Sequence, residues 1–217
     1  MKDYKYIIMC GGNYVKWPEK PKHLVEIGGE PLVARTIRLL REVGAEDIAI
    51  SSNNPIFEQF GVPVLKHENK YTLDWETSHG DWYDAFYPMD DPVCYLFGDV
   101  VFSRRALKTI VRHQTDAEND IMFFASAPPF ADNYCKPWAE PFAFKVANTE
   151  KFFMAIEKAK RLEKEHVFYR QPVSWELWQI IKETPINIIN YKNYVAINDF
   201  SCDIDTPEDI EKFSFLN

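Results

Sequence analysis

Three aspartates stand where their carboxylates could bind a divalent cation. Asp99 follows the apolar run VCYLFG, so we expect it at the carboxyl end of a central strand, where open α/β sheets bind their ligands. Asp203 and Asp205 both belong to DIDTPED, and in an extended segment their side chains project to the same side while Ile204 faces the core. Carboxylate oxygens are ligands that Mg²⁺ prefers. The sequence therefore predicts a metal site made of Asp99 and at least one of the other two aspartates.

These acids and their neighbours could also have simpler roles, in capping a helix or as surface charge. Asp99 could cap the helix that follows it, but Ser103 is better spaced for that cap. Asp203 and Asp205 could be ordinary surface charge. In the segment TPED at 206–209, the threonine is a natural N-cap, the proline suits a first helical position, and the two acids favour the helix dipole. We interpret 206–209 as the start of a helix and not as part of the site.

The segment CGGNYVKWPEKPKHL at 10–24 supplies the opposite charge. Its two glycines allow the backbone to approach a ligand, and consecutive amides in such a turn can form an anion-binding nest. Neither the P-loop pattern GxxxxGK[ST] nor the dinucleotide pattern GxGxxG occurs there. The segment is therefore expected to be a phosphate-binding loop of another kind, ordered by its ligand. The residues concerned are Gly11, Gly12, Lys16, Lys20 and Lys22.

The composition argues against several functions. The 217-residue chain has a net charge of −8 and no dense Lys/Arg cluster, so general nucleic-acid binding is not expected. The apolar stretch near the N-terminus is too short for a signal-peptide core or a membrane span, and we expect a cytoplasmic protein. No histidine pairs with a cysteine at zinc-ligand spacing. Four dispersed cysteines are expected as buried reduced thiols: Cys10, Cys94, Cys135 and Cys202.

Apolar runs alternate with amphipathic segments along the chain, which predicts an α/β fold with a mostly parallel sheet flanked by helices. A proline-rich aromatic loop follows residue 125, and we expect a small antiparallel and helical insertion at about 126–190 within a single domain, 1–217. Strands are expected at 4–10, 47–51, 62–67, 93–102, 121–127, 142–146, 186–191 and 194–199. Helices are expected from Pro31 to a stop at Gly44, at 104–114, 150–166 and 173–183, and after 206.

Three blocks carry a resemblance to a known family: CGGNYVKWPEKPKHLVEIGGEPLVARTIRLL, LFGDVVF and DIDTPEDIEKF. In their order and spacing they resemble the sugar-nucleotide pyrophosphorylase-like nucleotidyltransferases, which include the MobA-like and cytidylyltransferase branches. The first block is the most specific, since Pro-Lys at 21–22 and the Gly-Gly-x-Pro-Leu turn at 28–32 match the family pattern. The resemblance implies a GT-A-type, Rossmann-like fold and a cytoplasmic, magnesium-dependent transferase.

The resemblance also implies a role for individual residues. Lys22 would contact phosphate and stabilise charge in the transition state, with Lys16 as a second catalytic cation. Asp99 and Asp205 would hold the catalytic Mg²⁺, with Asp203 as an auxiliary ligand. Further nucleotide contacts would come from Cys10, Gly11, Gly12, Asn13, Thr77, Ser78 and Gly98.

The opening block departs from the family pattern at two points. Asn13 and Tyr14 stand where the family has its next glycine, and Lys16 stands where it has an arginine. A lysine keeps the positive charge but lacks the planar fork that binds phosphate through two hydrogen bonds. Lys16 is therefore expected to hold a triphosphate less firmly than the family arginine.

The implied reaction is attack by an acceptor phosphate on the α-phosphorus of a nucleoside triphosphate, CTP by first expectation, with release of pyrophosphate. The acceptor would be a sugar, polyol or amino-alcohol phosphate, and the product a precursor for cell-surface polysaccharide. At helical spacing, Trp175 and Trp178 are more typical of a core or a homodimer contact than of a ligand platform. The acceptor is expected against Tyr134, Lys136, Trp138, Arg170, Trp175, Glu176 and Trp178.

Two other functions remain open from the sequence. A GT-A glycosyltransferase would use Asp203 and Asp205 as its DxD metal motif, although that motif lies mid-chain in such enzymes and here follows Asp99 by a hundred residues. A non-catalytic nucleotide-binding regulator would explain the missing glycine and arginine. Retention of Lys22 together with Asp99 and Asp205 favours nucleotidyl transfer over both.

Overall fold

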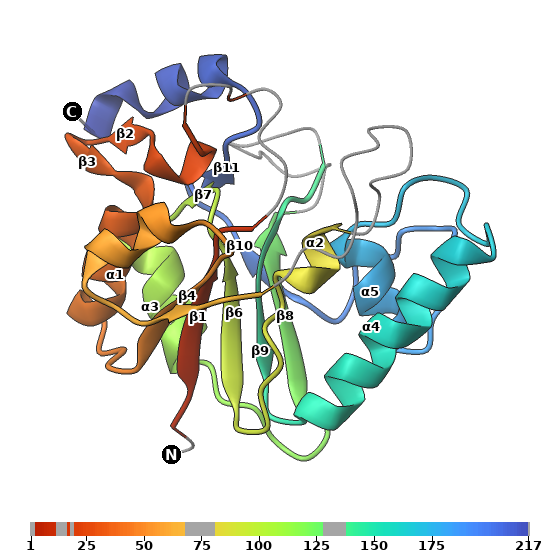
Figure 1. Ribbon diagram of the computed structural model, residues 1–217. Helices are drawn as coiled ribbons and strands as arrows, with labels where there is room; N and C mark the ends of the chain where they lie inside the picture. The colour runs from red at the N-terminus through yellow and green to blue at the C-terminus, as the bar shows by residue number, and fades with distance from the viewer. Residues whose placement is uncertain (1–2, 12–16, 18–19, 68–80, 128–137, 217) are drawn as a thin grey trace.

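The computed structural model describes residues 3–11, 17, 20–67, 81–127 and 138–216, and a seven-stranded sheet forms its centre (Figure 1). Pairing is parallel throughout this sheet except around one strand, which runs antiparallel to both of its neighbours. The predicted mostly parallel α/β fold is therefore confirmed. In spatial order the strands are β10 (Val195–Ile197), β8 (Ile121–Ser126), the antiparallel β9 (Pro141–Val146), β6 (Val93–Phe97), β1 (Lys5–Met9), β4 (Ile48–Ser51) and β5 (Val64–Leu65).

Helices cover both faces of the sheet, which explains why β1 is apolar at nearly every position (Figure 1). Tyr6 and Ile8 pack in one core cluster with α1 (Leu32–Glu42) and α3 (Arg104–Arg112). Ile7 and Met9 alternate with them and pack in a second cluster with α4 (Thr149–Lys164) and α5 (Ser174–Ile181). In the described part of the chain, none of the helices has the length and apolar character needed to cross a membrane.

Helix ends follow the expected signals. The Ser103 hydroxyl accepts a hydrogen bond from the amide of Ala106 at 2.9 Å, so α3 has the predicted cap. Asn148 caps α4 in the same way, through the amide of Lys151 at 3.1 Å. Gly44, just after α1, has a φ of +96°, which glycine adopts without strain.

Two short sheets join the N-terminal and C-terminal segments above the main sheet. One is the hairpin of β2 (Glu26–Ile27) and β3 (Glu30–Pro31), and the other pairs β7 (Val100–Val101) with β11 (Cys202–Asp203). Their apolar side chains form a third core cluster, with Ile204 at its centre and fully buried. Sequence segments about 175 residues apart are thereby packed against each other. The cluster consists of Val25, Ile27, Leu32, Val101, Cys202, Ile204 and Phe213.

Two predictions of local structure were wrong. The expected strand 93–102 is two strands, β6 and β7, because the chain turns at Gly98 and Asp99. The expected strand 186–191 does not form, since its backbone bonds to the side chain of Gln179, which donates to the Ile188 carbonyl at 3.0 Å. The helix expected after residue 206 is present, as a 3₁₀ helix at Pro207–Leu216.

The cysteine prediction holds in part. Cys10 and Cys94 are free and buried, as expected. Cys202, by contrast, takes part in a disulfide bond, which the dispersed spacing of the cysteines did not suggest. Cys135 lies outside the described residues.

Candidate active site

A lysine and an aspartate from distant segments form an ion pair at the carboxyl end of the central strands. Asp99 lies in the turn that follows β6, and Lys22 opens a 3₁₀ helix, Lys22–Leu24. The Lys22 Nζ is 2.5 Å from the Asp99 Oδ2, and the two side chains are 19% and 24% exposed. Burial alone would lower the pKa of Lys22, but the Asp99 carboxylate outweighs it and the pKa is raised. Burial would raise the pKa of Asp99, but the charge of Lys22, with smaller contributions from His23 and from the Lys22 hydrogen bond, outweighs burial, and the pKa is lowered.

The second acidic motif adjoins this pair through backbone contacts. The amide of Ile204 donates to the carbonyl of Asp99 at 2.9 Å, which extends the pairing of β11 with β7. Asp203 and Asp205, on either side of Ile204, both help to raise the pKa of Lys22, Asp205 more than Asp203. The predicted association of these acids with the Lys22 region is therefore present. Three carboxylates act on one ammonium group.

The backbone around Asp205 is held by a buried carboxylate. Asp209 Oδ2 accepts the amides of Asp205 and Thr206, both at 3.0 Å, and the carbonyl of Asp205 accepts the Trp17 indole at 3.3 Å. Lys212 Nζ lies 2.6 Å from the other Asp209 oxygen. Asp209 thus acts as an anchor for the DIDT turn, whereas the sequence had suggested only a favourable interaction with a helix dipole.

The donor set fits Mg²⁺. That ion is bound in proteins by one or two carboxylates together with substrate phosphates and water, so a cage of protein ligands is not needed. Asp99 and Asp203 line a common cavity. Asp205 is not part of that lining, but like the other two aspartates it raises the pKa of Lys22. Within the described ranges no three His, Cys, Asp or Glu side chains are grouped closely enough to hold a metal ion, so Asp99, Asp203 and Asp205 do not form a three-carboxylate site in this structure. Any Mg²⁺ here would take most of its remaining ligands from phosphate and water.

Two residues beside the ion pair have structural roles that shape the site. His23 is buried, and burial, assisted by the Lys22 charge and opposed by Asp99, lowers its pKa to about 4. It is therefore neutral near pH 7. Gly98 was predicted to contact nucleotide, and its observed role is close packing: a Cβ there would lie 2.3 Å from the carbonyl oxygen of Met9. That close approach fixes the turn that presents Asp99.

Two adjacent serines hold the segments around the start of the opening loop: Ser51, the last residue of β4, and Ser52, which follows it. Ser52 donates to the Cys10 carbonyl at 2.9 Å. Ser51 donates to the Ala85 carbonyl at 2.8 Å, so at 2.9 Å it accepts from the Nδ1 of His67. The other ring nitrogen of His67 faces Gly11, where a Cβ would lie 2.9 Å from it. Gly11 is thus required by packing against His67.

Several predicted site residues cannot be placed. They lie outside the described residues: Gly12, Asn13, Lys16, Thr77, Ser78, Tyr134 and Lys136.

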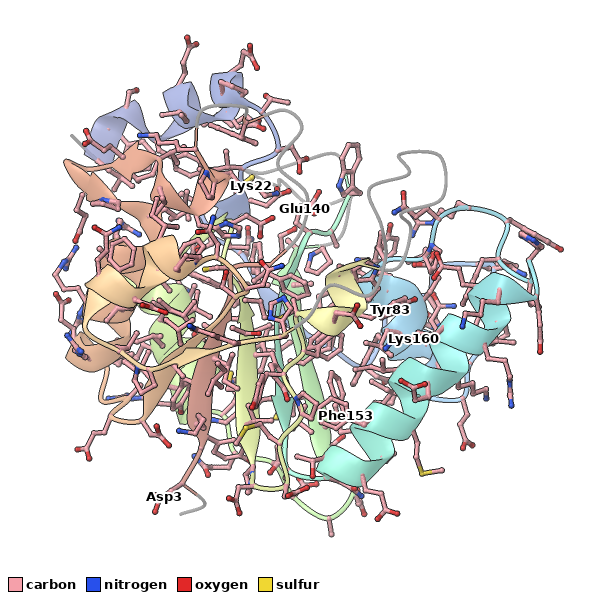
Figure 2. All side chains as sticks on the ribbon, viewed as in Figure 1. Asp3, Lys22, Tyr83, Glu140, Phe153 and Lys160 are labelled. Atoms are coloured by element: carbon pink, nitrogen blue, oxygen red, sulfur yellow. The ribbon has the colours of Figure 1, made fainter. Side chains whose placement is uncertain are left out.

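A cavity of about 450 Å³ lies beside Asp99 and Asp203, and we call it the aromatic cavity. The antiparallel direction of β9 explains its position, because the residues that enter β9 lie at the edge where β1 and β6 end. Lys22 and Glu140 accordingly lie at the same end of the molecule, opposite Asp3 (Figure 2). Its side-chain lining includes Trp82, Phe97, Asp99, Trp138, Glu140, Arg170, Trp175, Tyr191 and Asp203.

The predicted acceptor residues differ in their positions. Arg170 and Trp175 line the aromatic cavity. Glu176 does not: one of its oxygens pairs with Arg170 at 2.8 Å, and the other accepts the amide of Val173 at 2.9 Å at the start of α5. Trp178 is buried in the core, as its helical spacing indicated.

Comparison with known families decides the class of protein. Residues 6–174 match the family model of the MobA-like NTP transferase domain, which is more than half of the chain. The chain belongs to this family. The MobA-like protein is therefore a transferase of nucleotidyl groups, as the sequence blocks had indicated.

Solved structures share the fold of this MobA-like transferase at low sequence identity. The inositol-1-phosphate CTP transferase from T. maritima is 15% identical with a TM-score of 0.61, over 100% of this chain and 97% of that chain. The CTP:phosphocholine cytidylyltransferase from Streptococcus pneumoniae is 15% identical with a TM-score of 0.55, over 100% and 99%. A CMP:2-keto-3-deoxy-manno-octonic acid synthetase complexed with CTP is 15% identical with a TM-score of 0.54, over 98% and 96%. No curated protein sequence matches the chain.

Sequence reasoning on the MobA-like transferase did not identify three residues of the site. Glu140 was not singled out among the residues that follow the proline-rich loop. His23 stands directly after Lys22 in PKHL, and its neutral state follows from burial against Phe57, whose ring centroid lies 5.9 Å away. Asp209 carried a signal, because an acid three residues after Thr206 is the spacing at which a side chain reaches back to the start of a helix.

Proposed function

We propose that the protein transfers the nucleotidyl group of a nucleoside triphosphate, CTP in the first instance, to the phosphate of a small phosphorylated acceptor, with release of pyrophosphate. The observation that carries the proposal is the ion pair of Lys22 and Asp99 at the edge of the aromatic cavity. A lysine suited to binding phosphate and an aspartate suited to binding a metal ion therefore lie beside a cavity suited to a second substrate.

The residues of the chain would divide the work as follows. Lys22 would bind a triphosphate oxygen, and Asp99 with Asp205 would hold Mg²⁺, with Asp203 as an auxiliary ligand. When bound, Mg²⁺ supplies neutralisation of the phosphate charge that grows during the transfer. The acceptor phosphate is already ionised near neutral pH, so in-line positioning and charge neutralisation are needed more than a general base.

We propose that residues 1–217 act as one nucleotidyltransferase domain. Its support is that β8, β9 and β10 of the second half belong to the same sheet as β1, β4, β5 and β6. The acceptor side, at about 126–190, would then be an integral part of that domain. The product, a nucleoside diphosphate ester of the acceptor that carries a phosphoanhydride bond, would be a precursor for cell-surface polysaccharide.

A pyrophosphate-release assay tests the proposed reaction. Each of four NTPs would be combined, with Mg²⁺, with a panel of phosphorylated sugars, polyols and amino alcohols. We expect release with one NTP, CTP first, and a loss of two to three orders of magnitude for Asp99→Asn. Glu157→Gln, an exposed change on α4, is the matched control and should retain activity. Turnover of a nucleotide sugar without pyrophosphate would overturn the proposal in favour of a glycosyltransferase, and NTP binding without turnover of any pair would favour a regulator.

A further inference from the structure

The aromatic cavity has rings on several sides. Trp175 and Tyr191 meet edge to face with centroids 4.9 Å apart, and the Trp175 indole donates to the Ala139 carbonyl at 2.7 Å. Trp82 stacks against Tyr83 at 4.0 Å on the α2 segment (Asp81–Asp84). These contacts hold the rings in place independently of any ligand.

One ring and one carboxylate are joined at the cavity wall. The indole of Trp138 donates a hydrogen bond to Glu140 Oε1, while the Trp138 side chain remains 48% exposed. Glu140 is itself held rigidly, because its amide donates to the Ser126 hydroxyl at 2.7 Å and its carbonyl accepts the Ser126 amide at 2.8 Å. A buried carboxylate is thus fixed beside a half-exposed indole ring.

The described lining of the aromatic cavity is acidic. It holds the carboxylates of Asp99, Glu140 and Asp203 and one guanidinium, that of Arg170. The Arg170 charge is matched by Glu176 at 2.8 Å, and the Asp99 charge is matched by Lys22 at 2.5 Å. The pKa of Tyr191 is raised, first by burial and also by the carboxylates of Glu176 and Glu140, against the effect of Arg170. Burial is therefore the main cause, and Glu140 and Glu176 both lie close enough to Tyr191 to act on its hydroxyl.

Resting on the proposed function, we propose that the aromatic cavity binds the cationic end of the acceptor, which is the phosphate monoester of an amino alcohol. The ammonium group would lie against the rings of Trp138, Trp175 and Tyr191 beside Glu140. The phosphate of the same molecule would point toward Lys22 and Asp99, at the other side of the cavity.

The chemistry of the wall favours a cation over a neutral sugar. Tryptophan and tyrosine faces attract an ammonium group through the negative charge of the ring, and this attraction increases when water is excluded. A carboxylate beside the rings adds a charge that a neutral hydroxyl cannot match. A sugar ring would need several hydrogen-bonding partners, and the described neutral polar side chains of the lining are Gln171, Ser174 and Tyr191, while the indoles of Trp138 and Trp175 already donate to protein groups.

A binding comparison with two isosteres tests this assignment on the full chain. Phosphocholine and 3,3-dimethylbutyl phosphate have the same shape and differ by the replacement of the charged nitrogen with carbon. Isothermal titration of each ester should give an affinity about tenfold higher for phosphocholine. Equal affinities, or tighter binding of the neutral ester, would overturn the proposal.

Variants locate the preference at the cavity wall. Trp138→Leu and Glu140→Gln should each reduce the preference for the cationic ester to about threefold or less, and Trp138→Phe should retain most of it. Glu157→Gln changes an exposed acid on α4 and should leave it at the wild-type value. Trp138 is half exposed, so its variants test the proposal even where Glu140→Gln fails to fold. An unchanged preference in Trp138→Leu would exclude this wall as the cation site.

The outcomes separate this proposal from the reaction on which it rests. Cation-selective binding without pyrophosphate release from any NTP would contradict the proposed function and retain the cavity assignment. Pyrophosphate release with a sugar phosphate in preference to phosphocholine would retain the function and overturn the cavity assignment.

Discussion

The ammonium nitrogen of Lys22 lies 2.5 Å from a carboxylate oxygen of Asp99, so the residues predicted to bind phosphate and metal neutralise each other. A metal ion and a triphosphate would have to separate this pair, drawing Asp99 to the cation and Lys22 to the phosphate. The raised pKa of Lys22 keeps the lysine charged at neutral pH, so a cation that approaches Asp99 competes with a full positive charge.

Replacing the lysine should therefore have opposite effects on metal binding and on turnover. In Lys22→Met we expect Mn²⁺ to bind about fivefold more tightly without nucleotide, since a competing ion pair at this depth is worth about 1 kcal/mol. Turnover should fall by about two to three orders of magnitude. Mn²⁺ titration followed by electron paramagnetic resonance measures the first effect. Lys20→Met, an exposed lysine of the same segment, is the control, and unchanged Mn²⁺ affinity in Lys22→Met would exclude the competition.

Gly98 is predicted to be intolerant of any side chain. A Cβ would lie 2.3 Å from the Met9 carbonyl oxygen and 2.9 Å from the Cys10 Sγ, so the turn that carries Asp99 would have to move. We expect Gly98→Ala to lower the free energy of unfolding by about 2–3 kcal/mol and to weaken Mn²⁺ binding. Gly29→Ala, with a φ of +75° and no neighbour within 4 Å, should cost about 1 kcal/mol from backbone strain alone. Urea denaturation measures the free energy of unfolding of both variants. An equal loss of unfolding free energy in the two variants would contradict the packing argument.

Asp209 should act on catalysis through the position of Asp205. Asp209→Ala removes the acceptor of the amides of Asp205 and Thr206, and we expect a loss of about 2 kcal/mol of stability and a several-fold higher metal requirement for turnover. Asp209→Asn keeps one acceptor oxygen and should recover most of the metal affinity. Glu208→Gln, at the neighbouring position, should change neither quantity. If Asp209→Ala loses stability but keeps the wild-type metal requirement, the anchor is purely structural.

The sequence predicted those parts of the fold that depend on local pattern. The apolar run of β1, the Ser103 cap of α3 and the glycine after α1 each have a local physical cause, and each is present. The turn between β6 and β7 was missed because apolar residues continue on both sides of Gly98 and Asp99. What breaks the strand there is the close approach of Met9, which lies about ninety residues away in the chain.

Contacts between distant segments explain what the sequence left out of the site. Lys22, Asp99 and the two later aspartates were identified from their types and motifs, but their mutual ion pairing depends on the packing of Ile204 with the first segment. Glu140 gains its position from β9, which lies in the expected antiparallel insertion, but the sequence did not indicate that the start of this strand would lie beside Asp99. Glu176 was read as an acceptor contact, and its oxygens are engaged by Arg170 and the start of α5.

His23 should make the stability of the protein depend on pH in the acidic range. Its pKa in the folded protein is about 4, against about 6.5 for an unperturbed histidine, so the unfolded chain binds a proton that the native state rejects between these values. Stability should therefore be complete above pH 6.5 and fall as the pH decreases toward 4, by about 3 kcal/mol from this residue. In His23→Gln that contribution is absent, while the titrating carboxylates are common to both proteins. Urea denaturation of the wild type and of His23→Gln at pH 7, 5.5 and 4.5, with chelator present, measures the difference in their stability. As the pH falls, this difference should shift in favour of His23→Gln by most of that ~3 kcal/mol. A difference that does not depend on pH would mean that His23 does not resist protonation.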